Sequence, residues 1–289
     1  MKKTEFDSVI KNNVMEKEGE AAVIYVTASK AYDNYYSKEF FDKFQKEMSE
    51  KYSEYYKFYA DGAGGELKEK QLKGTWIPPK MASVASSSRL CYCALRDGAE
   101  VLGGNTVKFE YECKIEDIAA MTYPQLDAYI EESHTFIEAK CHEIFDSHKV
   151  ELSEKYKPYI TEDFGIKSMV EQDKKIKIDL SVFGIKETTS RFDIKQLLCH
   201  LIGIKSEMKK LKLAESKLTY LFFIPISKVD KENEQIKTVF GELKEEINKI
   251  FNSNPIRKFT EDNHIKLDAI AERAEIMEAL TKENVVSLM

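Results

Sequence analysis

The feature that most constrains the fold is a continuous apolar run, LTYLFFIPI, at residues 218–226. A charged residue precedes it and a polar residue follows it, Lys217 and Ser227. The run is far shorter than the roughly 18 apolar residues of a membrane-spanning helix. An unbroken apolar run of this length is typical of a strand buried on both faces, and such strands lie at the centre of sheets that helices cover. The run therefore predicts a central strand in an α/β fold.

Other segments complete this α/β pattern. Residues 107–113, 126–131 and 135–141 have strand character and follow one another closely, which predicts a meander. A further strand is expected around residues 176–182. Apolar residues at helical spacing predict helices over residues 38–59, 79–95, 192–204, 236–250 and 267–280, and a helix-like stretch starts at residue 150. The order of these elements predicts an α/β core with helices added at both termini.

The composition of the chain suits a globular protein. Hydrophobic residues make up 43% and charged residues 33% of the 289 residues, which argues against long disorder and fibrous repeats. No apolar stretch approaches membrane-spanning length, so we expect a cytoplasmic protein without a membrane partner. The five cysteines are odd in number and scattered, which suits reduced core thiols. We expect a helical extension at residues 1–60 packed on a core at residues 61–230, and a C-terminal helical extension at residues 231–289.

The charge of the chain bears on nucleic acid as a partner. The net charge of −6 argues mildly against a surface coated with phosphate-binding lysines. Local distribution matters more, and lysines are concentrated between Lys205 and Lys217. This basic stretch is either a DNA contact or a solvated helix face, and the solvated face is the simpler interpretation.

A carboxylate and a lysine share one face of the expected strand in the sequence FIEAK. Strand alternation puts Glu138 and Lys140 on one side, and Ile137 and Ala139 on the other. The apolar side belongs to the core. The small and apolar neighbours of the two charged residues predict that both are partly removed from water. The alternative is a surface strand with an ordinary ion pair, and E-x-K alone is common in such strands.

The preceding strand supplies a second acid to this face. If the turn is centred between Glu132 and Ser133, antiparallel pairing puts Asp127 directly opposite Glu138, with β-carbons roughly 5 Å apart. Two facing acids repel each other unless a cation or a proton lies between them. A hard divalent ion resolves the conflict, and Mg²⁺ bound by one or two carboxylates and a substrate phosphate is the usual arrangement in phosphoryl chemistry. Lys140 could then orient the attacking water and offset charge on the phosphate.

These residues belong to a longer ordered phrase, PQLDAYIEESHTFIEAK, at residues 124–140. In its order of proline, aspartate, short hairpin and E-x-K, the sequence resembles the PD-(D/E)XK superfamily. The resemblance implies a restriction-endonuclease-like core, in which helices flank a mixed central sheet, and cleavage of DNA with Mg²⁺, for which Mn²⁺ is a substitute. It implies Asp127, Glu138 and Lys140 as the chemical centre.

Within that superfamily, the chain resembles a family of restriction-endonuclease-like bacterial proteins. The shared stretches lie around PPKMASVASSSRL, QLDAYIE, FIEAKCHEIF and KQLLCHLIGI, and the resemblance spans residues 66–225. The sequence departs from the superfamily pattern at one point, because two residues separate Pro124 from Asp127. That proline is often absent in the superfamily.

Two polar residues on the expected helix at residues 192–204 extend the candidate site. Gln196 and His200 lie on one polar stripe, and their spacing is similar to the Q-xxx-Y motif that follows E-x-K in several nucleases. They could orient Lys140, a carboxylate or a phosphate. The alternatives are a solvent-facing seam for Gln196 and a hydrogen-bonded core residue for His200, and the core interpretation is favoured for His200.

Glu66 is the candidate for the upstream acid of the superfamily, because it precedes the helix before the three strands. It would be a catalytic residue and a metal ligand beside Asp127 and Glu138. The alternative is a first-turn glutamate favoured by the helix dipole.

Three functions follow from these patterns. The leading one is an Mg²⁺-dependent DNA endonuclease that acts in restriction or defence, and we expect a C2 homodimer because many enzymes that cut both strands are symmetric dimers. The alternative is a catalytically silent nucleic-acid-binding module with the same fold, which the acidic net charge and the lack of an obvious target-recognition domain leave open. The third is an interaction protein whose terminal helices mediate assembly. Neither the DNA target nor a methyltransferase partner follows from the sequence.

Overall fold

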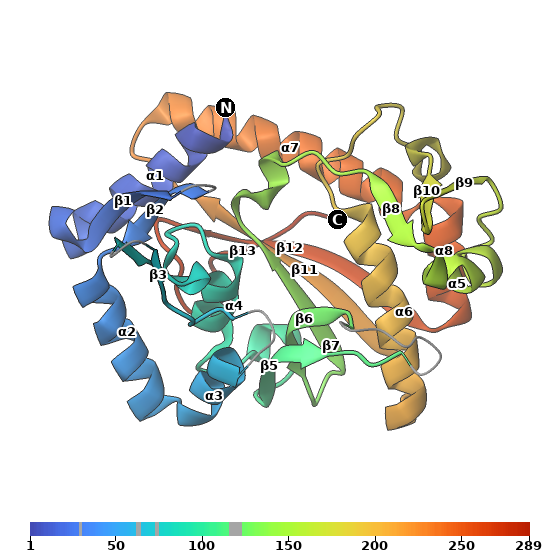
Figure 1. Cartoon of the computed structure of the whole chain (residues 1–289), viewed down its shortest axis with the longest axis horizontal. Coiled ribbons are helices and arrows are strands. Elements are labelled where there is room, and N and C mark those ends of the chain that lie inside the picture. The colour runs from blue at the N-terminus through green and yellow to red at the C-terminus, as the bar shows by residue number, and fades with distance from the viewer. Residues whose placement is uncertain (29–30, 62–64, 73–74, 116–122) are drawn as a thin grey trace.

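The centre of the protein is a mixed six-stranded sheet in the order β13-β12-β11-β7-β6-β5 (Figure 1). A computed structural model describes residues 1–28, 31–61, 65–72, 75–115 and 123–289. The strands of this sheet are β5 (Val107–Glu112), β6 (Gln125–Ile130), β7 (Thr135–Lys140), β11 (Ser216–Pro225), β12 (Ile265–Ala274) and β13 (Val285–Ser287). β5, β6 and β7 form an antiparallel meander, β7, β11 and β12 run parallel, and β13 is antiparallel to β12. The predicted meander and α/β class are confirmed.

The apolar run found in the sequence forms β11, which lies between β7 and β12. Leu221 and Phe223 are buried on one face of the sheet, and Tyr220 and Phe222 are buried on the other. Each of the ten residues of β11 pairs with a residue of β12. The expected central strand is therefore confirmed, and its burial on both faces explains why its apolar residues do not alternate with polar ones.

Helices cover both faces of the sheet (Figure 1). They are α1 (Lys3–Glu18), α2 (Lys38–Lys51), α3 (Ser53–Asp61), α4 (Ser87–Leu95), α5 (Lys157–Glu162), α6 (Ile194–Leu211), α7 (Asp230–Phe251) and α8 (Asn254–Asp262). On one face, the ring of Phe109 in β5 packs on Tyr59 of α3 and Tyr92 of α4. On the other face, Tyr220 of β11 packs on Phe251 at the end of α7. No helix in the described ranges is long and apolar enough to cross a membrane.

Three smaller sheets lie outside the central one. β1 (Val23–Ala28) pairs with β2 (Ala31–Tyr36), and β3 (Lys70–Leu72) pairs with β4 (Thr75–Ile77). β8 (Val150–Ser153), β10 (Lys175–Ile178) and β9 (Met169–Gln172) form the third. The strand expected around residues 176–182 is present in part as β10, which ends at Ile178, and Leu180–Phe183 form a 3-10 helix. The helix-like stretch expected from residue 150 is wrong at its start, because alternating Val150 and Leu152 bury one face of β8.

The helix expected over residues 267–280 is wrong, because residues 265–274 form strand β12. Leu267 and Ile270 have helical spacing, but Ala269 and Ala271 are also buried, on either side of Ile270. Pairing with β11 along the whole strand outweighs the local helical pattern. The segment at residues 231–289 is consequently not the purely helical extension that the pattern predicts. After α7 and α8, it supplies β12 and β13 to the central sheet.

The remaining helices differ from expectation in their bounds. The stretch at residues 38–59 forms two helices, α2 and α3, that Tyr52 separates. The stretch at residues 79–95 is helical as α4 only from Ser87, where the hydroxyl of Ser86 caps the backbone N–H of Arg89. The helix expected at residues 192–204 begins at Ile194 and continues to Leu211 as α6.

Candidate active site

The β6–β7 hairpin has the register that the sequence predicts. Ala128 pairs with Ile137 and Ile130 pairs with Thr135, so the turn is centred between residues 132 and 133. The next position along each strand sets Asp127 opposite Glu138. The side chain of Asp127 also accepts a hydrogen bond from the backbone N–H of Ala139 on the opposite strand.

Glu138 of β7 is the centre of a hydrogen-bonded cluster. Its Oε1 accepts hydrogen bonds from Lys140 Nζ at 2.6 Å and from Gln196 Nε2 at 2.7 Å. Its Oε2 lies 3.7 Å from His200 Nε2. The side chain of Glu138 is only 5% exposed, so these contacts replace water around a carboxylate. The predicted position of Gln196 against the cluster is confirmed. Gln196 lies in the first turn of α6, where its backbone N–H donates to the capping side chain of Asp193.

Burial and mutual repulsion set the charge states of the cluster. Burial, and then the negative charge of Glu138, raise the pKa of Asp127 well above its ordinary range. Burial works against the positive charge of Lys140, but Glu138, and after it Glu143 and Asp127, hold the pKa of that lysine above its ordinary value. Lys140 is thus kept positively charged by the acids around it.

His200 belongs to the core side of this cluster. It is 2% exposed, and burial lowers its pKa although the charge of Glu138 opposes this. A neutral imidazole beside Glu138 fits the core interpretation made from the sequence.

Glu66 lies next to the start of α4, where it contacts Ser88. Its Oε1 accepts a hydrogen bond from Lys80 Nζ at 3.0 Å, and its Oε2 accepts one from the hydroxyl of Ser88 at 3.0 Å. A surface hollow of about 380 Å³ adjoins it, with Lys80, Ser88, His142 and Glu143 among the lining residues. Both oxygens of Glu66 therefore have partners, and it is not a first-turn glutamate of a helix.

Glu110 of β5 is an acid that the sequence analysis missed. It lies between the pairs Phe109–Ala128 and Tyr111–Leu126, which is the position opposite Asp127. Its φ of 53° is uncommon for a residue other than glycine and marks a distortion of the strand at this point. Its Oε2 accepts a hydrogen bond from Gln125 Nε2 at 3.0 Å. Those two side chains are held together on adjacent strands.

The charge of Glu110 depends on its acidic surroundings. Burial, and then the negative charge of Glu66, raise the pKa of Glu110 to about 7, although Lys80 opposes the shift. Glu138 contributes in the same direction as Glu66. Four carboxylates, those of Glu66, Glu110, Asp127 and Glu138, thus share one electrostatic neighbourhood.

The donor set fits a hard divalent cation held by two carboxylates. Within the described residues, no group of three or more histidine, cysteine, aspartate or glutamate side chains forms a complete metal-binding set. Mg²⁺ needs only one or two protein carboxylates, because water and substrate phosphate complete its octahedron. Asp127 and Glu138 would hold such an ion, since burial and then the charge of Glu138 disfavour an ionised Asp127 and a cation would offset both. Glu66, the third predicted ligand, has Lys80 and Ser88 as partners of its oxygens.

No protein-family model matches the chain, and no curated protein and no solved structure matches it.

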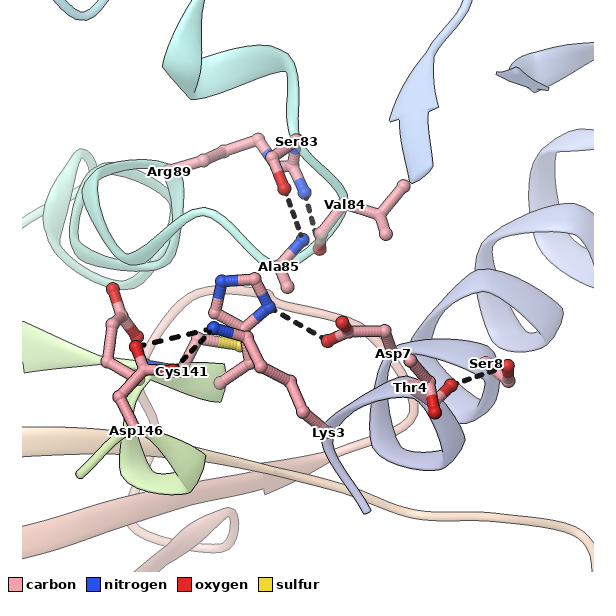
Figure 2. A network of polar contacts seen from close by, with 12 residues as sticks. Lys3, Thr4, Asp7, Ser8, Ser83, Val84, Ala85, Arg89, Cys141 and Asp146 are labelled. Atoms are coloured by element: carbon pink, nitrogen blue, oxygen red, sulfur yellow. Dashed lines mark hydrogen bonds and ion pairs between the residues drawn. The ribbon is translucent and has the colours of Figure 1, made fainter. Parts of the chain in front are cut away.

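Helix α1 holds the turn that follows β7. Figure 2 shows Asp7 on α1 pointing toward this turn and Lys3 pointing toward Asp146. Asp7 Oδ1 lies 2.9 Å from His142 Nδ1, and Lys3 Nζ lies 3.1 Å from Asp146 Oδ1. The N-terminal helix thus fixes the backbone two residues beyond Lys140.

A further acid, Glu143, lies in the same turn. Its Oε2 accepts the backbone N–H of Cys141 at 2.7 Å. Burial works against its charge, but Lys140, and then His142, hold the pKa of Glu143 below its ordinary value. The charges of Glu138, Glu143 and Asp127 thus all favour the protonated form of Lys140.

Proposed function

We propose that this protein is an Mg²⁺-dependent DNA endonuclease with a restriction-endonuclease-like core, related in its site to the PD-(D/E)XK superfamily. The observation that carries the proposal is the cluster on the β6–β7 hairpin, where Asp127 sits opposite Glu138 and Lys140 Nζ lies 2.6 Å from Glu138 Oε1. A surface E-x-K pair would be solvated, whereas the lysine and glutamate side chains are 16% and 5% exposed. Burying these two charges costs free energy, which only their mutual attraction and further hydrogen bonds can offset.

Each residue has a distinct role in the proposed reaction. Asp127 and Glu138 hold the ion at the end of the hairpin. When bound, Mg²⁺ supplies a water of lowered pKa and neutralises charge on the phosphate. Lys140, kept positively charged by its acidic neighbours, orients the attacking water and stabilises the charge that develops on the phosphate. Gln196 keeps Glu138 in place through its side-chain amide.

The arrangement of the elements supports the same proposal. The meander carries the acids, α6 crosses the sheet to reach Glu138, and β11 extends the sheet in parallel on the far side of β7. A mixed sheet with helices on both faces is what the sequence resemblance implies. A surface hollow adjoins Glu66, the upstream acid of the proposed site, and Lys80 in its lining is paired with that acid.

Cleavage of supercoiled plasmid DNA with and without Mg²⁺ tests the proposal, on both methylated and unmethylated substrates. Asp127→Ala and Glu138→Ala should lose Mg²⁺ binding, measured by calorimetry, and cleavage. Lys140→Ala should keep Mg²⁺ binding but lose roughly 10²–10³-fold in rate. The matched control is Lys108→Ala, a half-exposed lysine paired with Glu131 on the same sheet.

The outcomes separate the candidate functions. If Asp127→Ala cuts DNA as fast as the wild type, the proposed site is wrong. Salt-dependent DNA binding by the wild type without cleavage on any substrate would favour the catalytically silent binding module instead.

A further inference from the structure

A second cavity has Lys140 in its lining. Its volume is about 140 Å³, and it lies between the turn after β7, the start of α6, β11 and α7. Lys140 and Gln196 line the end that adjoins the candidate active site. The cavity therefore shares two residues with the proposed chemistry.

Aromatic and aliphatic side chains make up part of the lining, beside charged ones that include Glu143 and Asp146. Phe192, Phe222 and Leu243 line it, and all three are buried. The volume is close to the roughly 150 Å³ at which an apolar protein cavity takes up a single six-membered aromatic ring. Flat rings pack favourably on phenylalanine faces and edges. The cavity thus suits one aromatic ring and is small for two fused rings.

The rim of the cavity carries hydrogen-bonding groups of both kinds. His148 Nδ1 lies 3.5 Å from Asp193 Oδ2, and Arg191 Nη1 lies 2.7 Å from Glu242 Oε2. Asp193 is also fixed as the cap of α6. A ring that entered would meet an imidazole, a carboxylate and a guanidinium held in place by their neighbours. This combination of donors and acceptors matches the edge of a nucleobase.

We propose that this cavity receives one pyrimidine base of the substrate strand, turned out of the base stack beside the phosphate that Lys140 contacts. The inference rests on the proposed function and names its substrate more closely. Enzymes that take up an extruded base read its edge with hydrogen bonds and hold its faces between aromatic or apolar side chains. The apolar part of the lining and the polar rim meet these two requirements, and Lys140 in the lining connects the cavity to the proposed phosphate site.

Binding of free mononucleotides to the full chain tests the inference without a known DNA target. The probes are dTMP, dCMP, dAMP and 2-deoxyribose 5-phosphate, titrated by ligand-observed NMR in the absence of Mg²⁺. The two pyrimidine nucleotides should bind on the order of tenfold more tightly than deoxyribose phosphate, because stacking of the base adds to the affinity. They should also bind more tightly than dAMP. Equal affinity for dTMP and deoxyribose phosphate, or for dTMP and dAMP, overturns the inference.

Variants locate the binding. Leu243→Phe fills the cavity from α7 and should abolish dTMP binding. Because overpacking can unfold the chain, Arg191→Ala serves as a second variant and should weaken dTMP binding several-fold. Its matched control is Arg257→Ala, an exposed arginine on α8 that is paired with Glu261 and does not line the cavity, and it should bind dTMP as the wild type does. If folded Leu243→Phe or Arg191→Ala binds dTMP unchanged, the base does not occupy this cavity.

The same measurements separate this inference from the proposed function. Pyrimidine nucleotide binding in a protein that cuts no DNA keeps the base site and removes the nuclease assignment. DNA cleavage by a protein that shows no preference for a base keeps the nuclease assignment and removes the base site.

Discussion

Asp127 on β6 accepts a hydrogen bond at 2.7 Å from the backbone N–H of Ala139 on β7. A single carboxylate thus continues the ladder between two strands and faces a second acid, Glu138. Asp127→Asn keeps an oxygen that can accept this N–H but removes the charge. Without Mg²⁺, we expect Asp127→Asn to be at least as stable as the wild type, because the cost of burying a charge at this position and the repulsion with Glu138 are both gone.

The comparison variant for this prediction is Asp127→Ala, which leaves the N–H of Ala139 without its acceptor. Its free energy of unfolding in urea should be lower than that of Asp127→Asn by about 1 kcal/mol. Added Mg²⁺ should stabilise the wild type and neither variant, since only a ligand that binds the folded state raises its stability. Equal stabilisation of Asp127→Asn by Mg²⁺ would remove Asp127 from the metal site.

Gln196 is predicted to position Glu138 rather than to react. Gln196→Ala removes the 2.7 Å hydrogen bond to Glu138 Oε1 and should lower Mg²⁺ affinity or the cleavage rate roughly 10-fold to 100-fold, as the loss of a residue that orients a metal ligand does. Lys195→Ala, an exposed neighbour on α6, is the control and should leave both quantities unchanged. Isothermal titration with Mg²⁺ and single-turnover cleavage measure the two effects. An unchanged affinity and rate in Gln196→Ala would show that Lys140 alone orients Glu138.

The contact between α1 and the turn after β7 predicts a pH dependence of stability. Burial opposes protonation of His142, but the hydrogen bond and charge of Asp7, together with the charge of Glu143, outweigh it and the opposing Lys3, so the pKa of His142 is raised. A raised pKa means that this stabilisation is present below the unfolded value of about 6.5 and is lost as pH rises through the folded value. Between pH 6 and pH 8.5 the wild type should lose about 1 kcal/mol more than Asp7→Asn, measured by urea unfolding.

Ser8→Ala is the control for this pH dependence, because Ser8 lies on the same helix and bonds only within it, to the carbonyl of Thr4 (Figure 2). It should keep the slope of the wild type. If Asp7→Asn keeps that slope as well, the titration of His142 does not couple α1 to the turn.

Glu272 on β12 predicts a second pH effect, far from the candidate site. It is fully buried, its Oε1 accepts the backbone N–H of Glu278 at 2.9 Å, and its Oε2 has no hydrogen-bond partner among the residues that the structure describes. Burial raises the pKa of Glu272 to about 8. Stability is therefore present below the ordinary pKa of about 4.5 and is lost as pH rises from there to about 8, by on the order of 1 kcal/mol per pH unit.

Glu272→Gln removes this loss. The buried amide carries its own cost, but that cost is the same at pH 5 and at pH 9, so the difference between the two pH values isolates the carboxyl group. We expect the variant to lose less stability than the wild type between these values in urea unfolding. Glu275→Gln, an exposed acid beyond the strand, should behave as the wild type. A wild-type slope in Glu272→Gln would mean that Glu272 does not titrate in this range.

The candidate site was predictable where short-range geometry decides it. The short turn after Ile130 fixes the register of β6 and β7, so Asp127 and Glu138 could be placed opposite each other from the sequence. Gln196 was predictable because helical spacing puts it on a polar stripe. Its partner was a matter of tertiary packing, and only the fold brings Gln196 to Glu138.

Elements whose structure depends on distant partners were not predictable. Glu110 faces Asp127 through a register that no short turn determines, because residues 113–124 separate β5 from β6. The local sequence pattern of β12 predicts a helix, but the segment forms a strand because it pairs in parallel with β11. The contact between Asp7 and His142 spans 135 positions and has no local signal at all.

The parallel arrangement of β7 and β11 has a consequence for synthesis of the chain. The acidic hairpin can form as soon as Lys140 has left the ribosome, but Gln196 follows Glu138 by 58 positions, and β11 and β12 follow later still. Domains of this kind acquire their long-range parallel pairings late. The nascent chain therefore carries its acids well before it carries an ordered centre, and a product that stops short of β11 has the motif without the assembled site. Under the proposed function, this order of assembly delays activity until β11 and β12 have been made.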